Sequence, residues 1–255
     1  MAIMSLQSKP LSRSEGRSPV AAAAYRARVM LTDERQQVAR DYRYRSADIV
    51  SAEIIVPIGG LDVDRGDLWN AADRAEKRKD ARTAREWILA LPHELDETAR
   101  GRLARDFGQH LVDRYAIAVD VCVHQPDRAG DHRNHHAHIL ATTRQFDFGP
   151  DGRVALGKKA TIELSNSKRK LLGLGPVADE IKDLRQEWAD MANSALKQAG
   201  QEAQVDPRSL SDQGLDQQPT VHLGHAASAM ERRGILTGRG THNREVHRLR
   251  DDKVD

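Results

Sequence analysis

The stretch AIAVDVCVHQPDRAGDHRNHHAHILATT, residues 116–143, predicts the centre of the fold. Ala116–His124 and His135–Thr143 are rich in apolar and β-branched residues, and a polar, turn-prone segment separates them. Two such runs on either side of a turn predict a pair of antiparallel strands. Five of the eleven histidines of the chain lie between positions 124 and 138, around this turn.

Three of these histidines have the spacing of a metal site. Side chains alternate along a strand, so His136 and His138 share one face while His135 lies on the other. His124 ends the preceding strand, and pairing across the turn brings it beside them. Three neutral imidazoles suit a divalent transition metal and, with no carboxylate or cysteine in the set, leave positions open for a substrate oxygen. The alternative is that these histidines bind no metal and lie at the surface or in the core of a polar hairpin. We favour this interpretation for His132 and His135, as loop or sheet-back positions.

The flanking sequence predicts further elements. Strands are predicted at 2–8, 49–57 and 87–91, and helices at 66–79, 96–114 and 176–199. Residues 10–17 form a turn-prone loop, and Ser18 followed by Pro19 predicts a helix start that places Tyr25 about two turns into the helix. Gly149–Gly152 predicts a turn. Together these predict an α/β (α+β) fold with a central antiparallel sheet flanked by helices.

The predicted elements are concentrated in residues 1–200, which we expect to form one domain. Residues 201–255 are poor in long apolar runs and predict a C-terminal arm or lid with a short helix near 225–233. The polar last dozen residues are typical of a disordered tail.

The charge of the chain is clustered rather than strongly biased. The net charge is only +2, but the first 45 residues carry nine lysines and arginines against four acids, which favours a polyanionic partner without requiring one. The single cysteine, Cys122, excludes an intramolecular disulfide and a thiolate zinc cluster, and it favours a reducing compartment. No signal-peptide pattern and no run of about 20 apolar residues is present, so we expect a cytoplasmic protein without membrane insertion.

Several motifs resemble the MobA/MobL relaxases, a family within the HUH endonuclease superfamily. The strongest is His124–Arg144; the others are Ser12-Arg13-Ser14, Gly16-Arg17-Ser18, Ala21–Ala27, Glu76–Arg85, Pro92–Leu95, Val205–Ser209 and Met230–Gly234. The resemblance covers about residues 1–245 and implies the palm-like fold of HUH relaxases. Family members often continue into a C-terminal helicase or primase region, and this sequence resembles their N-terminal relaxase domain; it is either one domain of such a protein or a short relaxase.

The resemblance implies a strand-specific nick at a plasmid transfer origin, which starts conjugative mobilisation. A tyrosine replaces one phosphodiester bond with a covalent 5′-phosphotyrosine link, which conserves the energy of that bond. The family motif assigns this nucleophile to Tyr25; from residue type alone, Tyr42, Tyr44 and Tyr115 compete with it, as packing or base-stacking residues. The same motif assigns a divalent metal to His124, His136 and His138. Mg²⁺ or Mn²⁺ is expected, with Zn²⁺ or Ni²⁺ also able to bind in vitro.

Other roles follow from the same resemblance. Glu86 matches an acid that supports a histidine or the metal, with an exposed strand glutamate as the alternative. Contacts to DNA phosphates are expected from Arg13, Arg17, Arg26, Arg28, Arg78, Arg82, Arg85, Arg133 and Arg144. The expected partners are single-stranded DNA at the origin with an adjacent hairpin, accessory relaxosome proteins and a type IV secretion coupling protein. The protein would then travel to the recipient attached to DNA.

Two other classes of function remain open at this point. One is a metal-stabilised nucleic-acid-binding module without catalysis. The other is a related enzyme: a rolling-circle replication initiator with the same chemistry, or a metallohydrolase that leaves free 5′-phosphate ends. A covalent adduct that depends on Tyr25 separates a tyrosine nickase from the binding module and from the hydrolase.

Overall fold

The structure is a computed structural model that describes residues 5–57, 61–126, 131–208, 211–214, 218–221 and 223–251. The chain divides into two compact units, Met1–Asp206 and Pro207–Asp255. The first unit contains the central sheet and its helices, and the second contains α6 (Gly224–Arg232) and α7 (Gly238–Asp251). No helix among the described residues is both long and apolar enough to cross a bilayer.

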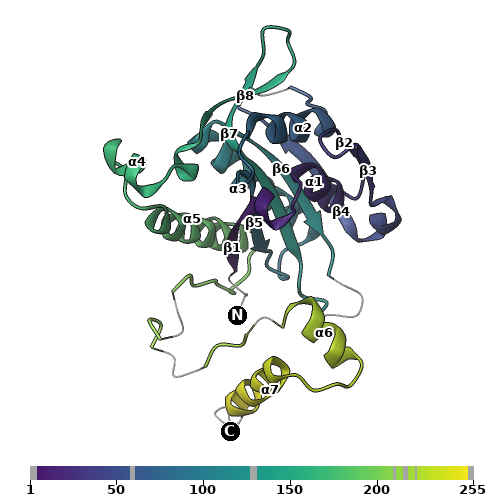
Figure 1. Cartoon of the computed structure of the whole chain (residues 1–255). Helices are drawn as coiled ribbons and strands as arrows, with labels where there is room; N and C mark the ends of the chain where they lie inside the picture. Colours follow the sequence, from purple (N-terminus) through teal and green to yellow (C-terminus); the bar gives the residue numbers. More distant parts are fainter. Residues whose placement is uncertain are drawn as a thin grey trace. The chain divides into compact units, whose positions relative to one another are not determined.

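The central sheet is built from antiparallel pairs. Its strands are β1 (Leu6–Ser12), β4 (Ile49–Ile55), β5 (Arg82–Ala90), β6 (Ile117–His124), β7 (His136–Phe148) and β8 (Val154–Lys159). Their order is β1-β5-β7-β6-β4, and β8 pairs with the second half of β7. The predicted antiparallel pair is therefore confirmed as β6 and β7, and β7 lies at the middle of the sheet (Figure 1).

Helices cover both faces of this sheet. On one face, α3 (Glu97–Tyr115) and α5 (Val177–Gln198) pack against Trp87, Leu89 and the valines of β6. On the other face, α1 (Pro19–Ala27) and α2 (Arg65–Ala75) bury Leu11, Leu140 and their own apolar side chains. The predicted fold class, a mixed α/β fold with a central antiparallel sheet flanked by helices, is confirmed.

The alternation of side chains along β6 determines which layer meets the histidines. Val119 and Val121 pack into the core beneath α3 and α5. Asp120 points the opposite way, where it accepts hydrogen bonds from Arg65 (2.8 Å) and Trp69 (3.1 Å) of α2. His124 has the same parity as Asp120, so it too faces the layer of α1 and α2.

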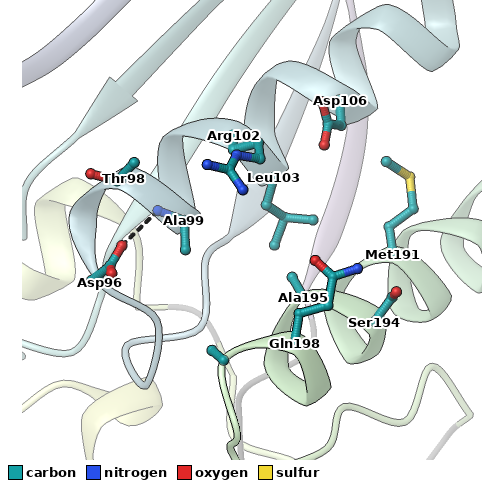
Figure 2. Close-up of a pocket in the computed structure, with 11 residues that line it drawn as sticks. Asp96, Thr98, Ala99, Arg102, Leu103, Asp106, Met191, Ser194, Ala195 and Gln198 are labelled. Carbon is teal, nitrogen blue, oxygen red and sulfur yellow. Dashed lines mark hydrogen bonds between the residues drawn. The ribbon is translucent and has the colours of Figure 1, made fainter.

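Helix α3 approaches the sheet closely at a glycine. A Cβ atom on Gly108 would lie 2.7 Å from Cγ2 of Val121 and 3.3 Å from Cδ1 of Ile55. The absence of a side chain at this position therefore allows α3 to pack directly on β4 and β6. Nearer the N-terminus of the same helix, a hollow of about 380 Å³ opens between α3 and α5, with Leu103 and Met191 among its lining residues (Figure 2).

The remaining short elements complete the first unit. They are η1 (Arg13–Glu15), β2 (Met30–Asp33), β3 (Val38–Asp41), η2 (Arg43–Asp48), η3 (Thr161–Glu163) and α4 (Asn166–Leu171). Strands β2 and β3 form a separate hairpin that the sequence pattern did not predict.

The boundaries differ from the prediction at both ends of the chain. Residues 2–4 of the predicted first strand lie outside the described residues, and β1 continues through Pro10 to Ser12, where a loop is predicted. Pro10 is tolerated there because β1 is an edge strand and needs no donor on its open side. Helix α7 covers most of the stretch in which the sequence predicts a disordered tail, and residues 252–255 lie outside the described part.

Candidate active site

Three imidazoles converge at one end of β6 and β7. His124 pairs with His136 across the two strands. Two residues further along the ladder, His138 lies opposite Cys122. The ring centroids of the three histidines lie 5.2–5.5 Å apart. One nitrogen from each ring lies within 4.8 Å of the others, close enough to hold a metal ion.

The hydrogen bonds of each ring indicate which nitrogen is free. His124 Nε2 lies 2.8 Å from the carbonyl of Arg26, and His136 Nδ1 lies 3.0 Å from the carbonyl of Asn134. His138 Nδ1 lies 2.7 Å from the Glu86 carboxylate. Carbonyl and carboxylate oxygens only accept, so these nitrogens carry the protons. The lone pairs remain on His124 Nδ1, which faces Arg28 Nη2 at 3.4 Å, and on Nε2 of His136 and of His138. This donor set fits a divalent transition metal.

Electrostatics keep two of the rings neutral, as metal ligands must be. Burial, and after it repulsion from His138, Arg28 and His136, lower the pKa of His124 to about 3, against the hydrogen bond to the Arg26 carbonyl. Burial also lowers the pKa of His136.

Glu86 supports the site from the adjacent strand β5. Its carboxylate is 5% exposed and accepts hydrogen bonds from His138 Nδ1 (2.7 Å) and Arg26 Nε (2.6 Å). Burial alone would raise the pKa of Glu86, but these two partners outweigh it and lower the pKa to about 2. Glu86 is therefore a buried, charged acid behind a histidine, which excludes the alternative of an exposed strand glutamate.

Tyr25 lies on α1 beside this cluster. Ser18 caps the helix by accepting a hydrogen bond from the Ala21 amide, and the helix ends where Arg28 adopts a left-handed conformation with φ 57°. That turn folds the Arg28 guanidinium over the Tyr25 ring, 4.4 Å from its centroid. The phenol oxygen accepts a hydrogen bond from Arg45 Nη1 at 3.1 Å.

Two hollows meet at Tyr25. The first, of about 450 Å³, is lined by Tyr25, Arg28, Arg45, Asp48 and all three histidines. The second, of about 300 Å³, is also lined by Tyr25, together with Arg17, Arg26 and Arg40 among others. The nucleophile candidate and the metal-ligand candidates thus share one cavity, and arginines line both hollows at the tyrosine.

The predicted phosphate-binding arginines differ in their surroundings. Ion pairs inside the fold join Arg13 to Asp73, Arg26 to Glu86, Arg28 to Asp48, Arg85 to Glu163 and Arg144 to Glu76. The exposed members are Arg17, Arg78, Arg82 and Arg133, three of which pair with Glu15, Asp80 and Asp131. The structure brings Arg17, Arg26 and Arg28 to Tyr25. Arg13 bonds to Asp73 and Arg85 to Glu163, and contact of these two arginines with DNA stays a prediction.

Three residues of the site are absent from the sequence prediction: Arg40, Arg45 and Asp48. Asp48 accepts two hydrogen bonds from Arg28, at 2.6 and 2.8 Å, and so holds the guanidinium that covers Tyr25. The sequence did carry a signal, the run Asp-Tyr-Arg-Tyr-Arg at 41–45, which interleaves aromatic and basic side chains.

The chain is similar to several known proteins in sequence and in fold. A model of the MobA/MobL family matches residues 17–233. The "Mobilization protein MobL" of Acidithiobacillus ferridurans is 38% identical over 266 residues, which cover 96% of this chain and 68% of that protein. The "Mobilization protein A" of Escherichia coli is 35% identical over 94% of this chain, but this chain spans only 32% of it. A solved structure described as "Molecular Basis of Vancomycin Resistance Transfer in Staphylococcus aureus" superposes with a TM-score of 0.64 and 27% identity, covering 82% of this chain and 100% of that one.

Proposed function

Because the chain belongs to the MobA/MobL family of mobilisation proteins, we propose that it is a relaxase that nicks one DNA strand at a plasmid transfer origin. The nick leaves a covalent 5′-phosphotyrosine link on Tyr25 and starts conjugative mobilisation. One observation carries this proposal: Tyr25 lines the same cavity as His124, His136 and His138, and one nitrogen from each of these rings lies within 4.8 Å of the others.

The reaction exchanges one ester for another. The Tyr25 oxygen attacks phosphorus, the bond to the 3′ oxygen breaks, and the phosphotyrosine ester replaces the phosphodiester without hydrolysis. The proton of the phenol passes to solvent or to a base in the cavity, and the 3′ oxygen takes up a proton as it leaves. A divalent cation held by the three histidines would polarise the phosphate and offset the charge that builds on its oxygens.

The protein groups around Tyr25 prepare this step. Arg45 donates to the phenol oxygen and Arg28 lies over the ring, so positive charge surrounds the atom that attacks. Glu86 holds His138 in the tautomer that leaves Nε2 free. Arg26, on the same helix as Tyr25, contacts the histidine cluster twice: its side chain donates to Glu86, and its carbonyl accepts from His124.

The DNA strand would enter along the two hollows. Arg17 and Arg40 line one of them and Arg45 the other, which supports phosphate contacts in both hollows next to Tyr25. Residues 201–255 would close over the strand as an arm or lid. An adjacent hairpin, accessory relaxosome proteins and a secretion coupling protein complete the proposed set of partners.

The test is a nicking reaction with Mn²⁺ and a 3′-labelled oligonucleotide that carries the transfer-origin strand of the protein's own plasmid. Wild type should shift the label to protein size on a denaturing gel, and both Tyr25→Phe and EDTA should abolish the shift. Cleavage without an adduct would indicate a hydrolase instead. Tight binding without cleavage would favour a metal-stabilised DNA-binding module, the second candidate.

A further inference from the structure

Three of the four tyrosines of the chain lie in one row that begins at the cavity. The Tyr25 ring packs edge-on against Tyr42, with centroids 5.3 Å apart. Tyr42 in turn contacts Tyr44 at 6.4 Å. Tyr44 ends the row at the surface with 78% of its area exposed.

Backbone contacts fix this row to the site. The Tyr42 amide donates to the carbonyl of Val29, just after α1, and the Tyr42 carbonyl accepts from the Arg45 amide. At the end of η2, the Asp48 carbonyl accepts from the amide of Gln125, which follows His124. The segment that carries the tyrosines is thus tied both to the nucleophile helix and to the metal-ligand strand.

A single exposed aromatic residue on a protein surface needs no explanation. Tyr44, however, lies among other aromatic side chains and arginines. Arg45 follows Tyr44 directly, lines the cavity and donates to the Tyr25 oxygen. Arg40, on the preceding strand β3, lines the second hollow at Tyr25. Rings for bases, interleaved with arginines for phosphates, are the means by which proteins bind single-stranded nucleic acid.

We propose that Tyr44 is a base-stacking subsite for the single strand that Tyr25 attacks, with Tyr42 as its fixed support; this inference rests on the proposed function. The path from the Tyr25 ring to the Tyr44 ring through Tyr42 is no longer than about 12 Å, and a nucleotide of B-form strand advances about 3.4 Å. The stacked base therefore lies within about four nucleotides of the scissile phosphate.

The test measures binding without chemistry. The reference is the full-length protein carrying Tyr25→Phe, which cannot form the adduct but keeps the aromatic ring at position 25. It is titrated into the fluorescein-labelled origin strand and into labelled oligo(dT), and fluorescence anisotropy gives the affinity for each. Tyr44→Ala should weaken binding of both probes about 5- to 150-fold, the effect of losing one stacked base. Tyr44→Phe, which keeps the ring, should bind within twofold of the reference. Leu171→Ala, which truncates a side chain that is 87% exposed on α4, controls for general surface effects and should bind as the reference does.

A second measurement locates the base. A set of origin strands, each with one abasic position, is titrated with the reference and with Tyr44→Ala. At one position, the missing base should weaken binding by the reference as much as Tyr44→Ala does. The same strand should weaken binding by Tyr44→Ala no further. Equal affinities of Tyr44→Ala and the reference would overturn the stacking subsite, as would equal losses in Tyr44→Ala and Tyr44→Phe. If wild type forms the covalent adduct while Tyr44→Ala binds normally, only this inference fails; if wild type neither binds nor nicks the origin strand, the proposed function fails with it.

Discussion

Replacing Glu86 by glutamine should weaken both the metal site and the fold. The glutamine has nearly the same shape, and its amide oxygen can still accept from His138 Nδ1. It removes the negative charge, however, that lies 2.6 Å from Arg26, whose side chain is only 13% exposed. The change thus separates the charge of Glu86 from its volume.

Two magnitudes follow from these contacts. Loss of one partner of a buried ion pair costs about 3–5 kcal/mol, and we expect the lower end, about 3 kcal/mol, because Arg26 keeps its hydrogen bond to the carbonyl of Ala22. An acid that orients a metal-binding histidine contributes about 10- to 100-fold in metal affinity, so Mn²⁺ binding should weaken by that factor.

Calorimetry of Mn²⁺ binding and urea unfolding of the metal-free protein measure the two effects separately. The matched control is Glu53→Gln, another strand glutamate paired with an arginine, Arg105, but 42% exposed. Its unfolding free energy should change by less than about 1 kcal/mol, and its Mn²⁺ affinity should not change. If Glu86→Gln bound Mn²⁺ as tightly as wild type and unfolded at the same urea concentration, Glu86 would have no supporting role at the site.

Three further changes test the rest of the structure. The pKa of Glu86, about 2, lies below its ordinary value of 4.5, so its charge stabilises the fold above pH 4.5 and that contribution disappears as the pH falls towards 2. Urea unfolding of the metal-free protein should accordingly depend on pH more steeply in wild type than in Glu86→Gln over that window, and parallel curves would contradict this. Gly108→Val should destabilise the protein by about 1–3 kcal/mol in the same assay, because its Cβ would lie 2.7 Å from a Val121 methyl group; Gly101→Val, on the same helix in open space, is the control and should lose less. Ser18→Ala removes the cap of α1 and the hydroxyl that donates to buried Asp33 at 2.5 Å. The midpoint of thermal unfolding should fall by an amount equivalent to about 1–3 kcal/mol, and an unchanged midpoint would refute the role of the cap.

The histidine strands were predictable because two apolar, β-branched runs flank a polar segment, which is typical of an antiparallel pair. The period of two along a strand then places His136 and His138 on one face. Ser18 and Pro19 were equally informative, since a helix start depends on local chemistry. Contacts of this kind are encoded within about ten residues of chain.

The residues that sequence reasoning missed depend on distant contacts. Arg40 lies on β3 and Arg45 on η2, and the hairpin before η2 is held in place by Asn70 of α2, which binds the Thr32 carbonyl and the Glu34 amide. No local pattern reveals that Asn70 and Thr32 meet. The ion pair of Arg85 with Glu163 could not be read from the sequence for a similar reason, because the two residues are 78 positions apart.

The position of β7 has a consequence for the synthesis of the chain. Both of its neighbours in the sheet, β5 and β6, leave the ribosome before it, and all eight residues of β6 are buried in the finished fold. At about 5–20 residues per second, the ribosome needs on the order of a second to pass from His124 to His136, and during that time both strands present unpaired edges. Two of the three histidines arrive with β7. A nascent chain therefore carries Tyr25 well before it carries the complete three-histidine cluster, so under the proposed function it gains the capacity to nick DNA only after β7 has been made.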